Sequence, residues 1–142
     1  MLSKACEYGI RAAVHVAHKS QNDERVGLKE IAAAIDSPEA FTGKIMQQLS
    51  RNGIVQSVKG PSGGFWMDKK SMKTVSVRDI VEVIDGDKLY TKCGLGLNKC
   101  DDAHPCPVHG QYKLIRDKVI EMHSKTLVAD LARKLNKNAR LK

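Results

Sequence analysis

Two short helical patterns joined by a tight turn restrict the fold of this chain more than any other feature. Residues 28–35 carry apolar side chains at helical spacing, and a second helical pattern continues to about Asn52. Asp36-Ser37-Pro38 lies between them and offers a capping side chain and a proline for the start of the second helix. Gly53 is a natural end for that helix. Helix, short turn and helix is the arrangement of a helix-turn-helix.

A glycine-rich turn follows the helix pair and lies between two strand-like runs. The runs are residues 54–58 and 65–67, and Lys59-Gly-Pro-Ser-Gly-Gly64 separates them. Glycine and proline in this stretch are typical of a tight turn, so we expect a β-hairpin. The helix pair and the basic hairpin together predict a winged helix-turn-helix, in a chain that is mainly α with one small β-hairpin.

The remaining helices are predicted from apolar spacing. A first helix over residues 2–19 should bury the face formed by Cys6, Ile10, Ala13, Val14 and Ala17. Another should cover residues 77–84, with Thr74 or Ser76 as its cap. A long C-terminal helix should carry a heptad-like seam for packing along another helix. The seam consists of Val108, Tyr112, Ile115, Val119 and Met122, and a short helix with Leu127, Leu131 and Leu135 follows it.

These patterns divide the 142 residues into three parts. Residues 1–88 are the predicted winged helix-turn-helix DNA-binding domain, and residues 89–109 are a cysteine-rich loop. Residues 110–142 are a dimerisation helix with a basic tail, whose last residues, 136–142, are expected to fray. This length suits one domain with an appended helix.

Charge and side-chain type make the second helix of the pair and the hairpin candidates for binding double-stranded DNA. The net charge is +8, and residues 40–67 contain three basic residues and no acidic one, which favours a polyanionic partner. Gln and Lys can read base edges in the major groove, and the hairpin suits phosphates or the minor groove. The candidate DNA-binding residues are Ser37, Thr42, Lys44, Gln47, Gln48, Arg51, Lys59 and Ser62. A solvated basic surface or a protein-binding module is the alternative interpretation.

Three cysteines, Cys93, Cys100 and Cys106, share one glycine-containing loop. Their spacing is wider than the short knuckles of structural zinc sites. A wide loop suits a larger object, such as a [2Fe–2S] or [4Fe–4S] cluster. Such a centre is easily lost in air, so aerobically purified protein need not retain it. A bound zinc ion, or three free thiols in a loop, remains the alternative.

Three thiolates leave one ligand position to be filled, and an incomplete thiolate set suits a labile, sensing centre. The candidates for this fourth ligand are His109, His104 and an acid of the first helix, Glu7. Glu7 could instead pair with Arg11, four residues further along the helix. His109 could simply pack at the start of the long helix. Cys6 is expected to be a small buried side chain and not a ligand.

The sequence also argues against other classes of protein. No apolar run approaches the ~20 residues of a membrane span. Arg11, His15 and His18 interrupt the N-terminal apolar run, so we expect no signal peptide, a cytoplasmic location and reduced thiols. No nucleophile–base pair, phosphate loop or promising carboxylate pair indicates an enzyme.

The chain resembles the IscR/NsrR-type family of winged-helix transcriptional regulators over nearly its whole length. A Gly-Pro-x-Gly-Gly wing joined to a cysteine trio is the specific part of the resemblance. The matching segments are residues 7–12 (Glu-Tyr-Gly-Ile-Arg-Ala), 28–32 (Leu-Lys-Glu-Ile-Ala), 48–55 (Gln-Leu-Ser-Arg-Asn-Gly-Ile-Val), 58–65 (Val-Lys-Gly-Pro-Ser-Gly-Gly-Phe), 77–81 (Val-Arg-Asp-Ile-Val) and the three cysteines.

This resemblance implies a homodimer with crossed C-terminal helices and a cluster in the loop of each subunit. It implies repression or activation that follows cluster presence or redox state, in response to cluster supply, nitric oxide or iron. The cysteines carry over to Cys93, Cys100 and Cys106. The fourth ligand would be His109 in an IscR-type member, or Glu7 of the partner subunit in an NsrR-type member. The first cysteine gap is one residue longer than in IscR, and Gly43 replaces a larger polar residue, which leaves the operator sequence open.

Overall fold

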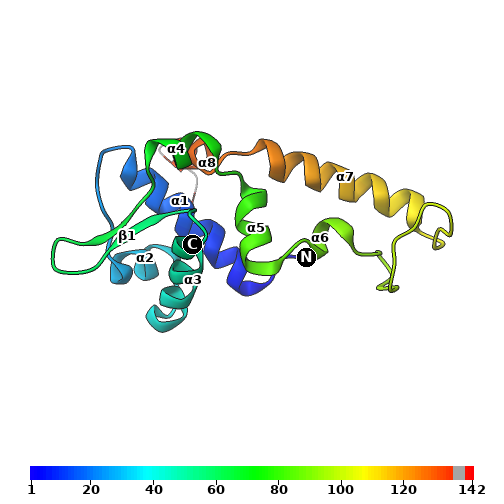
Figure 1. Cartoon of the computed structure of the whole chain (residues 1–142), viewed down its shortest axis with the longest axis horizontal. Coiled ribbons are helices and arrows are strands. Elements are labelled where there is room, and N and C mark those ends of the chain that lie inside the picture. The colour runs from blue at the N-terminus through cyan, green and yellow to red at the C-terminus, as the bar shows by residue number, and fades with distance from the viewer. Residues whose placement is uncertain (136–139) are drawn as a thin grey trace.

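The structure is a computed structural model that describes residues 1–135 and 140–142, and it is mainly helical with one two-stranded antiparallel sheet (Figure 1). This confirms the predicted fold class. In chain order the elements are α1 (Lys4–Ser20), α2 (Leu28–Ile35), α3 (Glu39–Arg51), β1 (Gln56–Val58), β2 (Gly64–Trp66), α4 (Lys69–Thr74), α5 (Val77–Asp85), α6 (Lys88–Thr91), α7 (His109–Lys125) and α8 (Val128–Lys134). Among the described helices, none is both long and apolar enough to cross a bilayer.

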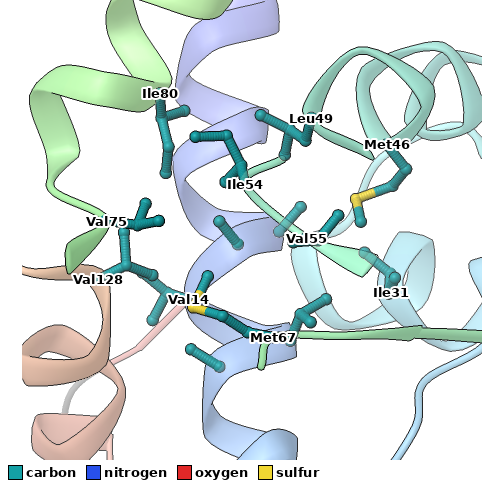
Figure 2. Packing of buried hydrophobic residues seen from close by; sticks show 14 of the residues in the cluster. Val14, Ile31, Met46, Leu49, Ile54, Val55, Met67, Val75, Ile80 and Val128 are labelled. Carbon is teal, nitrogen blue, oxygen red and sulfur yellow. The ribbon is translucent and has the colours of Figure 1, made fainter. Parts of the chain in front are cut away.

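Helix α1 lies at the centre of the core. Ala12, Ala13 and Ala17 are fully buried there, and such small side chains let α2, α3, α5 and α8 approach closely. Figure 2 shows Val14 of α1 among side chains from these neighbours. Cys6 is fully buried as predicted, in a second cluster with Val77, Val81 and Tyr90.

The turn between α2 and α3 differs in detail from the expectation. Asp36 ends α2 in the left-handed conformation, with φ 53°. Pro38 is the residue before the first turn of α3, and no side-chain hydrogen bond caps that turn. The expected cap by Asp36 or Ser37 is therefore wrong, because the Ser37 hydroxyl instead pairs with the Thr42 hydroxyl, with 3.0 Å between the two oxygen atoms.

The wing is anchored to the body of the domain. Its register pairs Ser57 with Phe65, and Phe65 also exchanges two backbone hydrogen bonds with Val26, at 2.8 and 2.9 Å. Gly64 makes this approach possible because a Cβ atom there would lie 2.9 Å from the Val26 carbonyl oxygen. The loop before α2 thus extends the hairpin and fixes the orientation of the wing relative to α3.

Two short helices lie outside the predicted elements. Helix α4 is capped by the Asp68 carboxylate, which accepts from the Ser71 N–H at 2.7 Å, and α6 lies within the predicted cysteine loop. Neither is long enough to show helical periodicity in its sequence. Helix α5 was predicted, and its cap is Ser76, in a reciprocal capping box with Asp79. Thr74 instead bonds back to the Lys70 carbonyl oxygen.

Helix α7 projects from the body of the molecule, and residues 92–108 fold back beside its far end, opposite the wing (Figure 1). Its base is tied to the winged helix-turn-helix part by backbone hydrogen bonds from Val77 N–H to the Thr126 carbonyl oxygen and from Val128 N–H to the Val75 carbonyl oxygen, at 2.9 and 3.0 Å. The predicted seam is only partly exposed, because the Tyr112 ring packs against Gly94. The exposed apolar side chains of α7 are Leu114, Ile115 and Met122. Four residues of the tail expected to fray, 136–139, lie outside the described residues.

Candidate functional site

A groove of about 590 Å³ lies between α3 and the wing. Lys44, Gln47 and Arg51 line it from α3, and Lys59 lines it from the turn after β1. All four side chains are exposed, and the groove lining contains no acidic residue. This arrangement brings together four of the eight candidate DNA-binding residues on one positive surface.

Two of the other candidates point elsewhere. Thr42 is fully buried, and its hydroxyl donates to the Pro38 carbonyl oxygen at 2.9 Å, so the prediction that it reads DNA is wrong. Gln48 is exposed, but its amide donates to the Val83 carbonyl oxygen of α5 at 3.4 Å, away from the groove. Ser37 is half-buried against Thr42, and Ser62 is exposed on the wing turn.

The structure also adds residues that the sequence analysis did not single out. Ser57 lines the groove and its hydroxyl lies 2.9 Å from that of Ser50. The Arg25 guanidinium lies 4.3 Å from the centre of the Trp66 ring, and it donates to the Ser62 carbonyl oxygen at 3.5 Å. Arg25 precedes the helix pair in sequence, so no local pattern links it to the wing.

At the other end of the molecule, the loop of residues 92–108 arranges its sulfur atoms in two groups. The Sγ atoms of Cys93 and Cys106 lie 3.6 Å apart. Cys100 Sγ lies 3.5 Å from His109 Nδ1, at the first residue of α7. Within the described residues, no three His, Cys, Asp or Glu side chains are close enough together to hold one metal ion. The donors therefore form two pairs and not one compact site.

The second ring nitrogen of His109 is held by Asp102. Nε2 lies 2.7 Å from the Asp102 carboxylate, which also accepts from Lys113 Nζ at 3.0 and 3.1 Å. The hydrogen bond from His109, and then that from Lys113, lowers the pKa of Asp102. An ionised carboxylate can only accept hydrogen bonds, so the His109 Nε2 atom carries a proton and donates it to Asp102. In the neutral His109 ring, Nδ1 then has a free lone pair, which faces Cys100.

Arg116 fastens this loop to α7. Its Nη1 atom donates to the Lys92 carbonyl oxygen and to Cys100 Sγ, both at 3.1 Å. The hydrogen bond to Cys100 raises the pKa of Arg116. Lys113 and Arg116 follow His109 by four and seven residues, so they share its helix face. That spacing was the signal that could have identified them from the sequence.

Cys93 and Cys6 differ strongly in their surroundings. The backbone N–H groups of Leu95 and Leu97 lower the pKa of Cys93, and the Leu95 nitrogen lies 3.4 Å from its sulfur. Burial, followed by the charge of Asp85, raises the pKa of Cys6 to about 12. Cys6 is therefore an inert thiol, whereas Cys93 has the environment of a thiolate.

The remaining ligand candidates lie apart from the sulfurs. Glu7 pairs with Lys4 at 3.3 Å. The alternative pair with Arg11 does not form, because Arg11 donates to the carbonyl oxygens of Ile35 and Leu141. Among the described residues, no hydrogen bond or ion pair joins Glu7 to the cysteine loop. His104 is strongly exposed and pairs with Asp101 at 3.3 Å.

Comparison with known proteins identifies relatives along nearly the whole chain. The family model described as Rrf2, iron-dependent transcriptional regulator, matches residues 2–134. A protein of Aquifex aeolicus named as an HTH-type transcriptional regulator is 32% identical over 133 residues, with 92% of this chain and 90% of that protein covered. The regulator IscR of Yersinia pseudotuberculosis is 25% identical over 92% of this chain and 77% of its own length.

Solved structures share the fold at lower identity. CymR, the global cysteine regulator of B. subtilis, has a TM-score of 0.75 at 22% identity and covers 94% of this chain and 96% of its own. IscR of T. potens has a TM-score of 0.73 at 21% identity, and the match covers 99% of this chain and 93% of that chain. The family match and the relative from Aquifex aeolicus confirm the predicted class of transcriptional regulator rather than enzyme. The chain belongs to the Rrf2 family of DNA-binding transcriptional regulators.

Proposed function

We propose that this regulator binds its DNA operator as a homodimer and changes its affinity with the state of an iron–sulfur cluster held by Cys93, Cys100, Cys106 and His109. The observation that carries the proposal is the arrangement of four soft donors in two pairs, Cys93 with Cys106 and Cys100 with His109. The family description as iron-dependent supports it.

The spacing within each pair fits a metal centre. Two sulfur ligands of one tetrahedral metal lie about 3.7 Å apart, and a sulfur and a nitrogen ligand about 3.5 Å apart, given bond lengths near 2.3 and 2.0 Å. The observed separations are 3.6 and 3.5 Å. Two ligands per iron is the requirement of a [2Fe–2S] cluster, whereas a [4Fe–4S] cluster takes one ligand per iron. The donor pairs therefore favour [2Fe–2S].

His109 is the better supported fourth ligand. Its Nε2–H donates a hydrogen bond to Asp102. Proteins commonly orient a ligating histidine in this way, which leaves its other ring nitrogen free to bind metal. Glu7 is paired with Lys4 and would have to come from the partner subunit. When bound, the cluster would supply a one-electron couple and reactivity toward oxidants and nitric oxide, which is the chemistry a sensor needs.

The fold supports a route from the loop to DNA. Arg116 and His109 attach the loop to α7. Just after α7, Thr126 and Val128 are joined by backbone hydrogen bonds to Val77 and Val75 at the start of α5. A change in how the loop holds α7 would move the two DNA-binding heads relative to each other. Half-sites must lie about 34–36 Å apart to be read together, so small movements change affinity. Residues 1–88 would bind DNA, 89–109 the cluster and 110–142 the partner subunit, in the cytoplasm.

The test is purification without oxygen, followed by absorbance between about 300 and 500 nm and by iron and sulfide assays. We expect two irons and two sulfides per chain, and loss of both in Cys93→Ala. Binding sites selected from random duplexes should then bind the loaded and the metal-free protein with different affinities. Iron-free, colourless protein after reconstitution, or equal affinity in both states, would contradict the proposal.

A thiol-based regulator without a cluster is the second candidate. It is favoured by the 3.6 Å separation of Cys93 and Cys106 and by the fold shared with CymR. Full DNA binding after iron removal, with loss of binding on thiol oxidation, would support this candidate. A single structural zinc ion is less well supported, because no three donors gather within the described part of the chain.

A further inference from the structure

The four cysteines differ in what surrounds their sulfur atoms, and this difference sorts them by reactivity. Cys6 is fully buried in the core. Cys100 is held between His109 and Arg116, at 3.5 and 3.1 Å. Cys93 and Cys106 face each other at 3.6 Å, and neither sulfur accepts from a cationic side chain among the described residues. Cys93 is only 6% exposed, whereas Cys106 is partly exposed. Among the described residues, this pair is the one in which two cysteine sulfurs lie side by side with one of them open to solvent.

We propose that in the metal-free protein Cys93 and Cys106 form a reversible disulfide within one chain, so that two of the sulfurs proposed as cluster ligands also form a redox modification site. The sulfur atoms need to approach by about 1.5 Å to reach disulfide bonding distance. The connecting loop can supply this movement, because residues 94–99 are exposed and Gly96 adopts a positive φ of 73° that permits a tight local turn. No helix or strand has to break.

The chemistry needs a peroxide as the oxidant. The Cys93 thiolate, which the Leu95 N–H stabilises, attacks one peroxide oxygen, so the O–O bond breaks, hydroxide leaves and a sulfenic acid forms. The Cys106 thiol then attacks that sulfur, so an S–S bond forms, the S–O bond breaks and water leaves. Two thiols and one hydrogen peroxide give one disulfide and two waters. A dithiol reverses the step by thiol–disulfide exchange.

The disulfide uses two of the four proposed cluster ligands, so it would block cluster loading until it is reduced. This consequence rests on the proposed function, whereas disulfide formation does not. Metal-free regulator that meets peroxide would be held in its cluster-free state. Reduction would return both sulfurs as ligands.

The experiment uses the full chain, stripped of metal by a chelator, reduced without oxygen, desalted and treated with one equivalent of hydrogen peroxide. Remaining thiols are alkylated and the protein is digested with trypsin and an Asp-specific protease. Used in separate digests, trypsin cleaves after Lys92 and Lys99 and separates Cys93 from Cys100 and Cys106, whereas the second protease cleaves before Asp101 and separates Cys106 from Cys93 and Cys100. Among the three loop cysteines, only a Cys93–Cys106 bond joins two peptides in both digests. We expect a Cys93–Cys106 cross-linked peptide, alkylated Cys6 and Cys100, and monomeric migration on a non-reducing denaturing gel.

Three single variants make the test specific. Cys100→Ser should form the disulfide as the natural chain does. Cys106→Ser should instead accumulate a sulfenic acid at Cys93 that dimedone traps, and Cys93→Ser should form no cross-link. A disulfide that involves Cys100, a cross-link between chains, or no disulfide at all would overturn the inference. A Cys93–Cys106 disulfide in a protein that never binds iron would leave the inference standing and remove the proposed function.

Discussion

At the scale of single residues, the cysteine loop depends on the side chains that hold the proposed ligands as much as on those proposed ligands themselves. Asp102 fixes the orientation of His109, Lys113 holds Asp102, and Arg116 bridges Cys100 and the Lys92 carbonyl. Partners of this kind commonly change metal affinity by ~10–100-fold when they are removed. The proposed DNA-binding groove is similar, since Lys59 and three side chains of α3 line one surface.

Variants at the two candidate fourth ligands should separate them. His109→Ala should remove most of the iron retained after anaerobic purification, and Asp102→Asn should weaken retention by ~10–100-fold, because His109 loses its orienting partner. Glu7→Ala is the matched control and should retain iron normally. The measurement is iron and sulfide content together with the visible spectrum. Normal iron in His109→Ala with loss in Glu7→Ala would reverse the assignment.

Lys59 should contribute through phosphate contact. Lys59→Ala should weaken binding to all duplexes similarly and lower the slope of log affinity against log salt by about one, because one fewer counterion is released. Titrations of selected duplexes at several salt concentrations measure this slope. Lys69→Ala, an exposed lysine of α4 outside the groove, should leave the slope unchanged. An unchanged slope in Lys59→Ala would exclude the wing from the interface.

At the scale of elements, the junction of α6 and α7 depends on a buried polar contact. The Tyr90 hydroxyl lies 2.8 Å from His123 Nδ1, and both residues are buried. Burial lowers the pKa of His123, so the folded state favours the neutral ring. The pKa of His15 in α1 is also lowered, again mainly because the side chain is buried. Short helices with little periodicity, such as α6, are positioned by contacts of this kind.

The stability of the chain should therefore depend on pH on the acid side of neutrality. Below the ordinary histidine pKa of 6.5 the unfolded chain takes up protons that folded His123 and His15 resist. The free energy of unfolding should be fully retained above that pH and should decrease as the pH falls through the folded pKa values. Urea unfolding of the metal-free protein at several pH values measures the effect. His123→Asn should reduce the slope of the free energy of unfolding against pH below about pH 6.5, and an identical slope would contradict the assignment.

At the scale of the whole molecule, the wing and the cysteine loop lie at opposite ends, with α5 and α7 between them (Figure 1). A single chain leaves apolar side chains of α7 uncovered, since Leu114 is 69% exposed and Ile115 63% exposed. These residues and Val119 line a shallow groove of about 370 Å³. A second copy of the same helix is the partner that the proposed homodimer places there.

Ile115→Glu should convert the dimer to a monomer, because a charge would be buried against apolar side chains. Sedimentation or light scattering measures the change, and selected duplexes with two half-sites should bind the variant more weakly. Asp117→Asn, two residues further along α7, should remain dimeric. A dimeric Ile115→Glu protein with normal DNA binding would show that another surface forms the interface.

The sequence by itself determined the helix-turn-helix, the wing, α5 and the long C-terminal helix, because helical periodicity and turn chemistry are local properties. It also identified the three cysteines and His109 as neighbours in one loop. Packing decided where individual side chains lie, which local patterns cannot predict. Thr42 is buried, and Gln48 turns toward α5. Glu7 pairs with Lys4, and Arg116 reaches back across 16 residues to Cys100. The pairing of Cys93 with Cys106 likewise required tertiary structure, because the path of a loop between two helices is set by the side chains it packs against.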